Sequence, residues 1–319
     1  MRIVFMGTPE FAVPTLERVV AAGHRVLLVL TQPDRPKGRG GHLAPSPVKE
    51  AALRLGLPLH QPERVRRPEV VELLRALETD AMVVVGYGQI IPQSIIDLPR
   101  HGIINVHASL LPKYRGAAPI QWAVANGEAI TGVTTMRINA GLDTGDMLMK
   151  YETPIGADED APQLGARLAM AGADLLVRTV GALESGTVTP VPQNDADATY
   201  APILKKEDGL IDWALPAPAI VNRTRGFLPW PGAWTWFRGQ VFHIWKARVA
   251  GSGEGICGAL IAERRRLLVQ CGANTRLELM EVQQEGRKRM SAEAFLNGVQ
   301  LGESRRAAPG ENDILGRTS

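Results

Sequence analysis

The feature that most constrains the fold is an alternation of short apolar runs with amphipathic segments over residues 2–112. Apolar runs of strand length lie at 2–7, 24–34, 81–88 and 102–112. Segments with apolar residues at helical spacing lie at 8–23, 45–58 and 68–80. Strands that are apolar throughout are buried on both faces, which is typical of a parallel sheet covered by helices. The pattern predicts an α/β domain with right-handed crossovers and a ligand site at the carboxyl ends of its strands.

The rest of the chain changes in composition along its length, from further α/β elements to a linker and then to a glycine-rich β part. Strands at 131–139 and 147–155 and a long helix at 161–186 continue the α/β pattern. A polar, Pro-containing stretch then resembles a linker, and short strand-like pieces separated by glycines follow it. Such pieces are typical of a small β-barrel, and an oligonucleotide-binding type fits them. We expect domains at 1–189 and 209–311, joined by a linker at 190–208.

Two polar residues end the last apolar run, in INVHASLLPKYRG at 104–116. Alternate residues of a strand share a face, so Asn105 and His107 should point the same way. Both would lie near the carboxyl end of their strand, where open α/β sheets bind ligands. A single polar residue in a strand is usually satisfied by neighbouring backbone. A pair followed by a tight polar loop favours an active site instead.

A second candidate is the segment NAGLDTGDML at 139–148, which places two carboxylates among glycines between two predicted strands. A carboxylate here would orient the His107 imidazole, and a solvated Asp–Gly turn is the competing interpretation. The DTG triplet does not indicate an aspartic protease, because that mechanism needs a second carboxylate sharing the proton and the sequence has no second DTG. Phosphate-loop and complete dinucleotide fingerprints are also missing from the sequence, and its scattered histidines do not predict a metal site.

Charge is distributed unevenly, although the net charge is only +3. Residues 209–319 contain 15 Lys and Arg against 10 Asp and Glu, whereas the rest of the chain contains 21 against 23. A basic C-terminal part on a near-neutral body suggests a polyanionic partner, and random scatter of surface charge is the alternative. The positive charge is concentrated at 205–206, 264–266 and 287–289.

The compartment is indicated by cysteine usage and by the first residues. Cys257 and Cys271 form no CxxC motif, so packed thiols in a reducing cytoplasm are expected. The N-terminal apolar run is broken by Gly7 and Pro9, unlike a signal peptide, and no run of about 18 apolar residues suggests a membrane span. We expect a cytoplasmic protein that does not bind membranes.

Several segments, in order from residue 2 to about 298, resemble the methionyl-tRNA formyltransferase family. They are GTPEFAVPTLE, TQPDRPKGRG, PSPVK, INVHASLLPKYRGAAPIQWA, GLDTGDML, IDW, PWPGAW and GRKRMSAEAFLNG. The blocks SLLPKYRGAAPIQ and DTGD are typical of transferases that use formyl-tetrahydrofolate, and TQPDRPKGRG with the C-terminal blocks narrows the resemblance to the tRNA enzymes. The resemblance implies a Rossmann-like, doubly wound and mainly parallel sheet domain followed by a small oligonucleotide-binding-type β-barrel.

The resemblance also implies an activity and its residues. The formyl group of 10-formyltetrahydrofolate would pass to the α-amine of methionine on initiator methionyl-tRNA. Apart from the resemblance, we expect a monomer that holds no metal. The catalytic residues correspond to Asn105, His107 and Asp143. Folate contacts correspond to Ser109, Leu110, Leu111 and Pro112, and the loop at 34–48, chiefly Arg39, corresponds to the part that reaches the tRNA. Because a folate pocket is largely apolar, we also expect Ile90 and Ile91 beside the pterin. The clusters of positive charge predict further tRNA contacts at the basic residues Lys206, Arg287 and Arg289.

Two other classes of protein remain possible from the sequence. Another formyl-folate enzyme, either a hydrolase that releases formate or a transferase acting on an amino sugar or small ribonucleotide, would share the Asn–His–Asp set. It would not need TQPDRPKGRG or a basic C-terminal part. A non-catalytic RNA-binding protein would not need Asn105, His107 and Asp143 intact.

Overall fold

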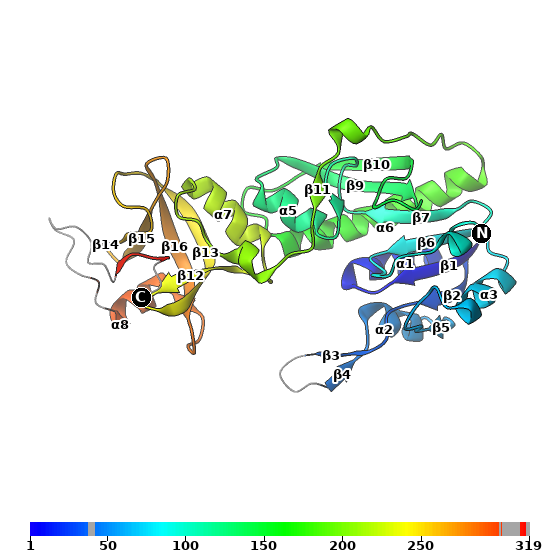
Figure 1. The fold of residues 1–319 in the computed structure, drawn as a ribbon, viewed down its shortest axis with the longest axis horizontal. Helices are drawn as coiled ribbons and strands as arrows, with labels where there is room; N and C mark the ends of the chain where they lie inside the picture. Colours follow the sequence, from blue (N-terminus) through cyan, green and yellow to red (C-terminus); the bar gives the residue numbers. More distant parts are fainter. Residues whose placement is uncertain (38–41, 300, 302–312, 317–319) are drawn as a thin grey trace. The chain divides into compact units, whose positions relative to one another are not determined.

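The computed structural model describes residues 1–37, 42–299, 301 and 313–316 (Figure 1). The chain divides into two compact units. The first consists of Met1–Pro119, Ile130–Pro154 and Leu164–Ala201, and the second consists of Ile120–Ala129, Ile155–Gln163 and Pro202–Ser319. Each unit has a hydrophobic core of its own.

The first unit is built on a sheet with the strand order β10-β9-β7-β6-β1-β2-β5. Its parallel strands are β1 (Arg2–Gly7), β2 (Arg25–Leu30), β5 (Leu59–His60), β6 (Ala81–Val85) and β7 (Ile103–His107). At one edge β9 (Ile130–Arg137) runs antiparallel to β7, and β10 (Met147–Pro154) runs antiparallel to β9. The order reverses at β1, so the predicted doubly wound, mainly parallel sheet is confirmed.

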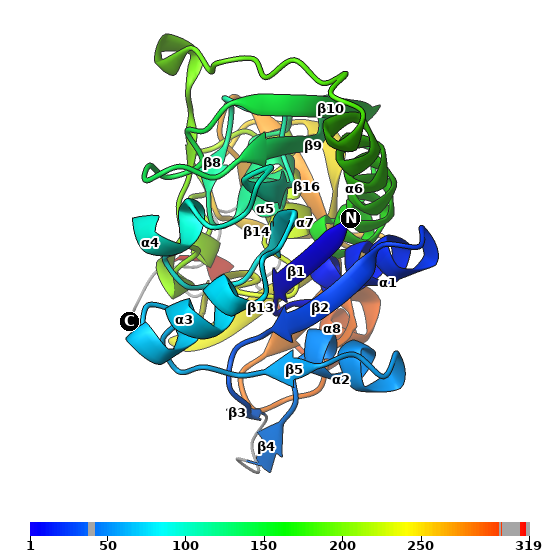
Figure 2. The ribbon, with the colours of Figure 1, turned by 90° about the vertical axis from the view of Figure 1, so that its right-hand side faces the viewer.

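Helices cover both faces of this sheet. In Figure 2, α1 (Val13–Ala21), α2 (Pro47–Arg54) and α6 (Ala161–Glu184) lie to one side, and α3 (Pro68–Ala76) and α4 (Gln93–Ile96) lie to the other. One buried cluster joins α3 and α4 to alternate residues of β1, β6 and β7, among them Ile103. On the opposite face, Gly172 of α6 lies against Val106 and Val133. The apolar character of the strands therefore follows from burial on two sides.

The local sequence explains where these elements begin and end. Ser46 caps α2 by accepting a hydrogen bond from the Lys49 N–H, with a proline at the first helical position. Gly23, at φ 80°, follows α1 in a conformation that favours glycine. The segment at 34–48, expected to be a loop, contains two short strands that sequence analysis did not predict. These strands, β3 (Arg35–Lys37) and β4 (His42–Ala44), pair antiparallel.

The second unit is a small antiparallel β domain, as predicted. Its strands are β12 (Ala233–Phe237), β13 (Gln240–Ser252), β14 (Leu260–Glu263), β15 (Arg266–Cys271), β16 (Thr275–Gln284) and β17 (Met290–Ser291). The core beneath them contains Phe237, Phe242 and Phe295, whose ring centroids lie 5.1–5.6 Å apart. The helices α7 (Ala217–Gly226) and α8 (Ala292–Gly298) contribute to the same core. Within the described ranges, no helix has the length and apolar character needed to cross a bilayer.

Candidate active site

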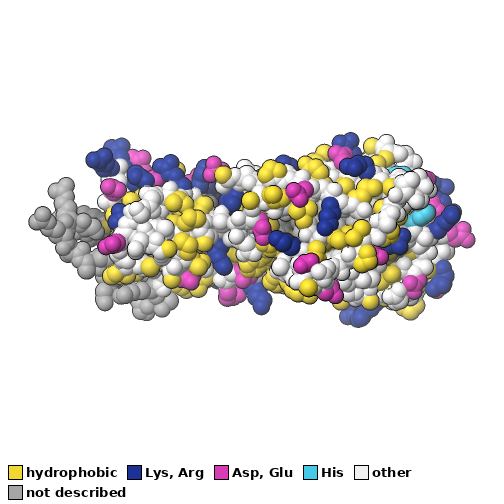
Figure 3. Space-filling view, turned by 90° about the horizontal axis from the view of Figure 1, so that it is seen from above, with side chains coloured by type: hydrophobic (Ala, Val, Ile, Leu, Met, Phe, Trp, Pro, Cys, Tyr) yellow, Lys and Arg dark blue, Asp and Glu magenta, His cyan; other side chains and the backbone are white. Residues whose placement is uncertain are grey.

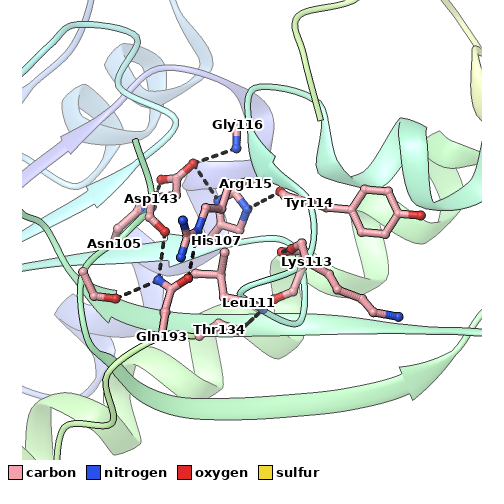
Figure 4. A network of polar contacts seen from close by, with 12 residues as sticks. Asn105, His107, Leu111, Lys113, Tyr114, Arg115, Gly116, Thr134, Asp143 and Gln193 are labelled. Atoms are coloured by element: carbon pink, nitrogen blue, oxygen red, sulfur yellow. Dashed lines mark hydrogen bonds and ion pairs between the residues drawn. The ribbon is translucent and has the colours of Figure 1, made fainter. Parts of the chain in front are cut away.

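The strand β7 supplies the first two polar side chains. It lies between β6 and β9 and ends at His107, with Asn105 opposite Met136 and His107 opposite Thr134. Asn105 and His107 lie on one face of the strand, and Val106 faces α6 on the other. Their position at the carboxyl end of a parallel strand is where open α/β sheets bind ligands (Figure 4).

Asp143 brings a third polar side chain to the same place. It lies in the loop between β9 and β10, and its Oδ2 accepts a hydrogen bond of 2.9 Å from the Gly116 N–H. The same oxygen lies 3.6 Å from His107 Nδ1, while Oδ1 accepts a long hydrogen bond of 3.5 Å from Asn105 Nδ2. The His107 and Asp143 side chains are only 6% and 16% exposed. The carboxylate thus bridges the amide and the imidazole in a largely desolvated position.

The second ring nitrogen of His107 has a fixed partner. Nε2 lies 2.9 Å from the backbone carbonyl oxygen of Tyr114. A carbonyl only accepts hydrogen bonds, so Nε2 carries a hydrogen and donates it. Nδ1 is therefore the ring nitrogen that faces Asp143.

The loop that follows His107 is held by its own hydrogen bonds. Thr134 Oγ1 accepts from the Leu111 N–H at 3.2 Å and donates to the Ser109 carbonyl at 2.7 Å. The Ser109 hydroxyl donates to the Lys113 carbonyl at 2.6 Å. Lys150 Nζ donates to the Leu111 carbonyl at 2.6 Å, and partial desolvation lowers the pKa of this lysine. The loop therefore has a defined backbone path.

The residues predicted to contact a folate differ in exposure. Ser109 and Leu111 are fully buried, whereas Leu110 and Pro112 are half-buried. Ile90 is 92% exposed, and the adjacent Ile91 packs against the core beneath α3 and α4. The apolar surface that a ligand can reach is therefore offered by Leu110, Pro112 and the pair at 90–91.

Sequence analysis missed a group of polar residues behind Asp143. Gln193 Nε2 donates to the carbonyls of Asp143 at 2.8 Å and Gly145 at 2.7 Å. Arg115, only 2% exposed, donates from Nε to Gln193 Oε1 at 3.0 Å and from Nη2 to Asp195 Oδ1 at 2.8 Å. Arg115 lies within the motif that drew attention to His107, which was a usable signal. Gln193 lies in a polar, Pro-containing segment in which nothing indicates burial.

The residues predicted to contact tRNA differ in their neighbours and in their exposure. Arg39 lies outside the described residues. Lys206 Nζ is 5.6 Å from the ring centroid of Trp234, and Arg287 is exposed. Arg289 forms an ion pair with Glu281, and its guanidinium lies 5.1 Å from the Trp245 ring centroid. On the face shown in Figure 3, Lys and Arg side chains are mixed with acidic and apolar ones.

The two cysteines and the possible metal ligands were the remaining candidates for a reactive or metal-binding site. Both cysteines are free, but only Cys271 is packed as expected, whereas Cys257 is exposed. Burial raises the pKa of the Cys271 thiol to about 12, as expected for a packed and unreactive thiol. In the part of the chain that the structure describes, no group of three or more His, Cys, Asp or Glu side chains is arranged to hold a metal ion.

Comparison with known proteins matches both units. The formyl transferase family model matches residues 1–180, and the model for the formyl transferase C-terminal domain matches residues 203–300. A solved N-formyltransferase from Helicobacter canadensis, in complex with folinic acid and dTDP-3-aminofucose, has a TM-score of 0.65 at 16% identity, covering 88% of this chain and 98% of that chain. At that identity the likeness concerns the fold alone.

Curated relatives are much more similar in sequence. The methionyl-tRNA formyltransferase of Solibacter usitatus is 63% identical over 310 residues, covering 97% of this chain and 99% of the relative. That of Koribacter versatilis is 59% identical over 321 residues, covering both chains fully at 100%. This identity extends through both units, and the chain therefore belongs to the methionyl-tRNA formyltransferase family.

Proposed function

We propose that this chain transfers the formyl group of 10-formyltetrahydrofolate to the α-amine of methionine on initiator methionyl-tRNA, with Asn105, His107 and Asp143 as catalytic residues. The observation that carries the residue assignment is the convergence of these three side chains on one point from β7 and the β9–β10 loop. The reaction forms a bond between the amine nitrogen and the formyl carbon and breaks the bond between that carbon and the folate nitrogen. One proton moves from the amine to the folate nitrogen.

Asp143 is the proton acceptor in this proposal. A carboxylate in a largely desolvated site can remove the proton that the attacking amine loses, directly or through a water. Its orientation is supported by the Gly116 N–H, which occupies Oδ2 at 2.9 Å. The long contact of 3.5 Å from Asn105 Nδ2 leaves Oδ1 the more available oxygen.

Asn105 and His107 stabilise the charge that develops on the formyl oxygen. Each amide nitrogen hydrogen of Asn105 is a donor, and one of them is used by Asp143. His107 acts through Nδ1, because Nε2 is committed to the Tyr114 carbonyl. Protonated at Nδ1, the ring stabilises the negative charge on the formyl oxygen and delivers the Nδ1 proton to the folate nitrogen. The proton that Asp143 takes from the amine then passes to Nδ1, which lies 3.6 Å from Asp143 Oδ2, so that one proton in total moves from the amine to the folate.

The folate requires an apolar surface close to these three residues. Leu110 and Pro112 follow His107 directly, and Ile90 and Ile91 follow β6, the neighbouring parallel strand. These side chains form the apolar contact for the pterin, with backbone groups to read its polar edge. Ser109 and Leu111, which are fully buried, hold the loop in shape through Thr134.

The tRNA requires positive charge in both units. Arg39 meets the acceptor end from the segment between β3 and β4, and Lys206, Arg287 and Arg289 meet phosphates. The support is the basic balance of residues 209–319 and the exposure of Arg287. Phosphate contacts of this kind make binding weaken as salt rises.

The proposal also covers the oligomeric state, the compartment and the domains of the enzyme. It acts as a monomer in the cytoplasm, with a catalytic domain at 1–189, a connecting segment at 190–208 and a tRNA-binding domain at 209–311. Light scattering of the purified protein at working concentration tests the oligomeric state, and a mass of twice 34.5 kDa would contradict it.

One assay tests the activity against its alternatives. The chain is incubated with 10-formyltetrahydrofolate and methionyl-tRNA, and formyl-methionine, free formate and unreacted folate are measured. Formyl-methionyl-tRNA is the expected product. Free formate as the main product would indicate a hydrolase, formylation of an added amino sugar in preference to the tRNA would indicate a sugar enzyme, and no turnover would indicate a binding protein.

The variant Asp143→Asn tests the residue assignment. It keeps the size of the side chain and removes the base, so kcat should fall by at least about 100-fold while folding and folate binding persist. Asp97→Asn, the same change at an exposed position that accepts a hydrogen bond from Gln93, is the matched control. Turnover of Asp143→Asn within a few-fold of the parent would refute the role of Asp143.

A further inference from the structure

We infer that Gln193 and Arg115 are positioning residues that hold Asp143 in place for formyl transfer. The inference rests on the proposed role of Asp143. Gln193 bonds to the backbone carbonyls of Asp143 and Gly145, and Arg115 bonds to Gln193 and Asp195, so both act through the backbone of the loop that carries Asp143 (Figure 4).

Asp143 has an unfavourable backbone conformation, so contacts from other residues must stabilise it. Its φ is 51°, in the left-handed region that residues other than glycine rarely adopt. Gln193 uses both amide hydrogens on this loop, one on the Asp143 carbonyl and one on the Gly145 carbonyl. The two bonds hold the Asp143–Thr144 and Gly145–Asp146 peptide units and fix the direction in which the Asp143 side chain leaves the loop.

Arg115 fixes the orientation of the Gln193 amide. Its Nε–H is held by Gln193 Oε1 at 3.0 Å, so the NH₂ group must face the loop. The opposite orientation would put Oε1 against two carbonyl oxygens and the NH₂ against a guanidinium. Arg115 is itself held at Nη2 by Asp195 and is only 2% exposed, so loss of Gln193 would leave its buried Nε–H without this partner.

The segment that carries Arg115 also reaches the carboxylate. Gly116, the next residue, donates its N–H to Asp143 Oδ2. The strand β8 (Arg115–Gly116) pairs with β11 (Tyr200–Ala201), and the Arg115 N–H donates to the Thr199 carbonyl at 2.8 Å. Residues 115–116 and 193–201 therefore form one frame that holds both the backbone and the side chain of Asp143.

The test compares Gln193→Ala with Gln193→Glu. A glutamate still accepts from Arg115, as a stronger ion pair, but it cannot donate to the Asp143 and Gly145 carbonyls. Both variants should lower kcat about 10- to 100-fold, with the KM values for folate and tRNA changed less than about threefold. Gln93→Ala, at an exposed glutamine that contacts only Asp97 among the described partners, is the control and should match the parent.

A merely structural role predicts a different pattern. If Gln193 served only to partner buried Arg115, Gln193→Glu would retain the parent kcat and Gln193→Ala alone would be impaired, which would overturn the inference. Circular dichroism melts of both variants identify any loss of folded protein. Gln193→Glu keeps the inference falsifiable if Gln193→Ala fails to fold.

A double variant separates this inference from the proposed function. Because Gln193 acts through Asp143, Asp143→Asn with Gln193→Glu should be no slower than Asp143→Asn alone. Additive losses would overturn the inference while leaving the role of Asp143 intact. If Asp143→Asn itself turns over like the parent, the proposed role of Asp143 fails first and the inference falls with it.

Discussion

At the scale of single residues, two strained backbone positions lie beside one imidazole. Tyr114 and Asp143 both have positive φ, at 60° and 51°, and both contact His107. The Tyr114 carbonyl holds Nε2, and the Asp143 carboxylate faces Nδ1. Such conformations cost about 1–3 kcal/mol each and persist where the surroundings enforce them. Here the surroundings are Thr199, which accepts the Tyr114 N–H at Oγ1, and Gln193, which holds the Asp143 loop.

Gly116 offers a test at this scale. A Cβ at Gly116 would lie 2.6 Å from the Ala201 carbonyl oxygen, and the residue has a φ of 120°. Gly116→Ala should therefore lower the free energy of unfolding by about 3 kcal/mol and displace the N–H that holds Asp143, lowering kcat as well. Thermal melts and turnover measure the two effects.

The matched control is Gly186→Ala. Gly186 also has a positive φ, 69°, but no atom lies within 4 Å of a Cβ built there. The substitution should cost only about 1 kcal/mol of backbone strain and leave kcat unchanged. Equal effects of the two alanines on kcat would contradict the idea that Gly116 holds the carboxylate.

At the scale of elements, the close approach of α6 to the sheet sets the position of β7. Gly172 of α6 faces Val106, the residue between Asn105 and His107, and a Cβ there would lie 2.9 Å from Val106 Cγ1. The helix thus presses directly on the back of the strand whose other face carries the polar pair. A rigid contact behind β7 keeps the Asn105 and His107 side chains at a fixed depth.

Two glycines of α6 should respond to alanine with opposite signs. Gly181 is exposed and has no atom within 4 Å of an added Cβ, so Gly181→Ala should stabilise the protein by about 1 kcal/mol through helix propensity. Gly172→Ala gains the same propensity but must displace Val106 and Val133, at an overpacking cost of about 1–3 kcal/mol. Gly172→Ala should therefore be net destabilising. Chemical denaturation of both variants measures the difference, and stabilisation by both would show that α6 does not press on β7.

At the scale of the whole molecule, the candidate active site and the excess of basic residues lie in different parts of the chain. The Asn105, His107 and Asp143 site belongs to the first compact unit, and residues 209–319, with their basic excess, belong to the second. Each unit has its own core, so substitutions in one need not disturb the other. Formyl transfer chemistry and tRNA affinity should therefore be separable by mutation.

Arg287→Ala tests this separation through the salt dependence of binding. If Arg287 meets a tRNA phosphate, the slope of log affinity against log salt should become shallower by about 0.7–0.9, with kcat at saturating tRNA unchanged. Arg75→Ala, at an exposed arginine of α3 paired with Glu72, should leave the slope as it is. Arg289 is a poorer choice, because its loss also breaks the contacts to Glu281 and Trp245. An unchanged slope for Arg287→Ala would remove this residue from the tRNA contact surface.

The sequence by itself determined the long strands and helices of the first unit and the first polar pair. Strands β1 and β6 appear as apolar runs because they are buried on both faces, and Asn105 and His107 of β7 stand out against that pattern. The two-residue period of a strand was enough to put Asn105 and His107 on one face. The sequence also predicted a β domain in the C-terminal part, because the short strand-like pieces there are separated by glycines.

Only the tertiary structure decided what surrounds Asp143. Gln193 is 50 residues away along the chain from the carbonyl that it binds, and no local periodicity links the two. Arg115 is a charged side chain whose near-complete burial cannot be seen in a pattern of polar and apolar residues, because burial of a charge depends on partners from distant segments. Local sequence specifies secondary structure through short-range sterics and periodicity, whereas polar networks form only when folding brings separated donors and acceptors within about 3 Å of one another.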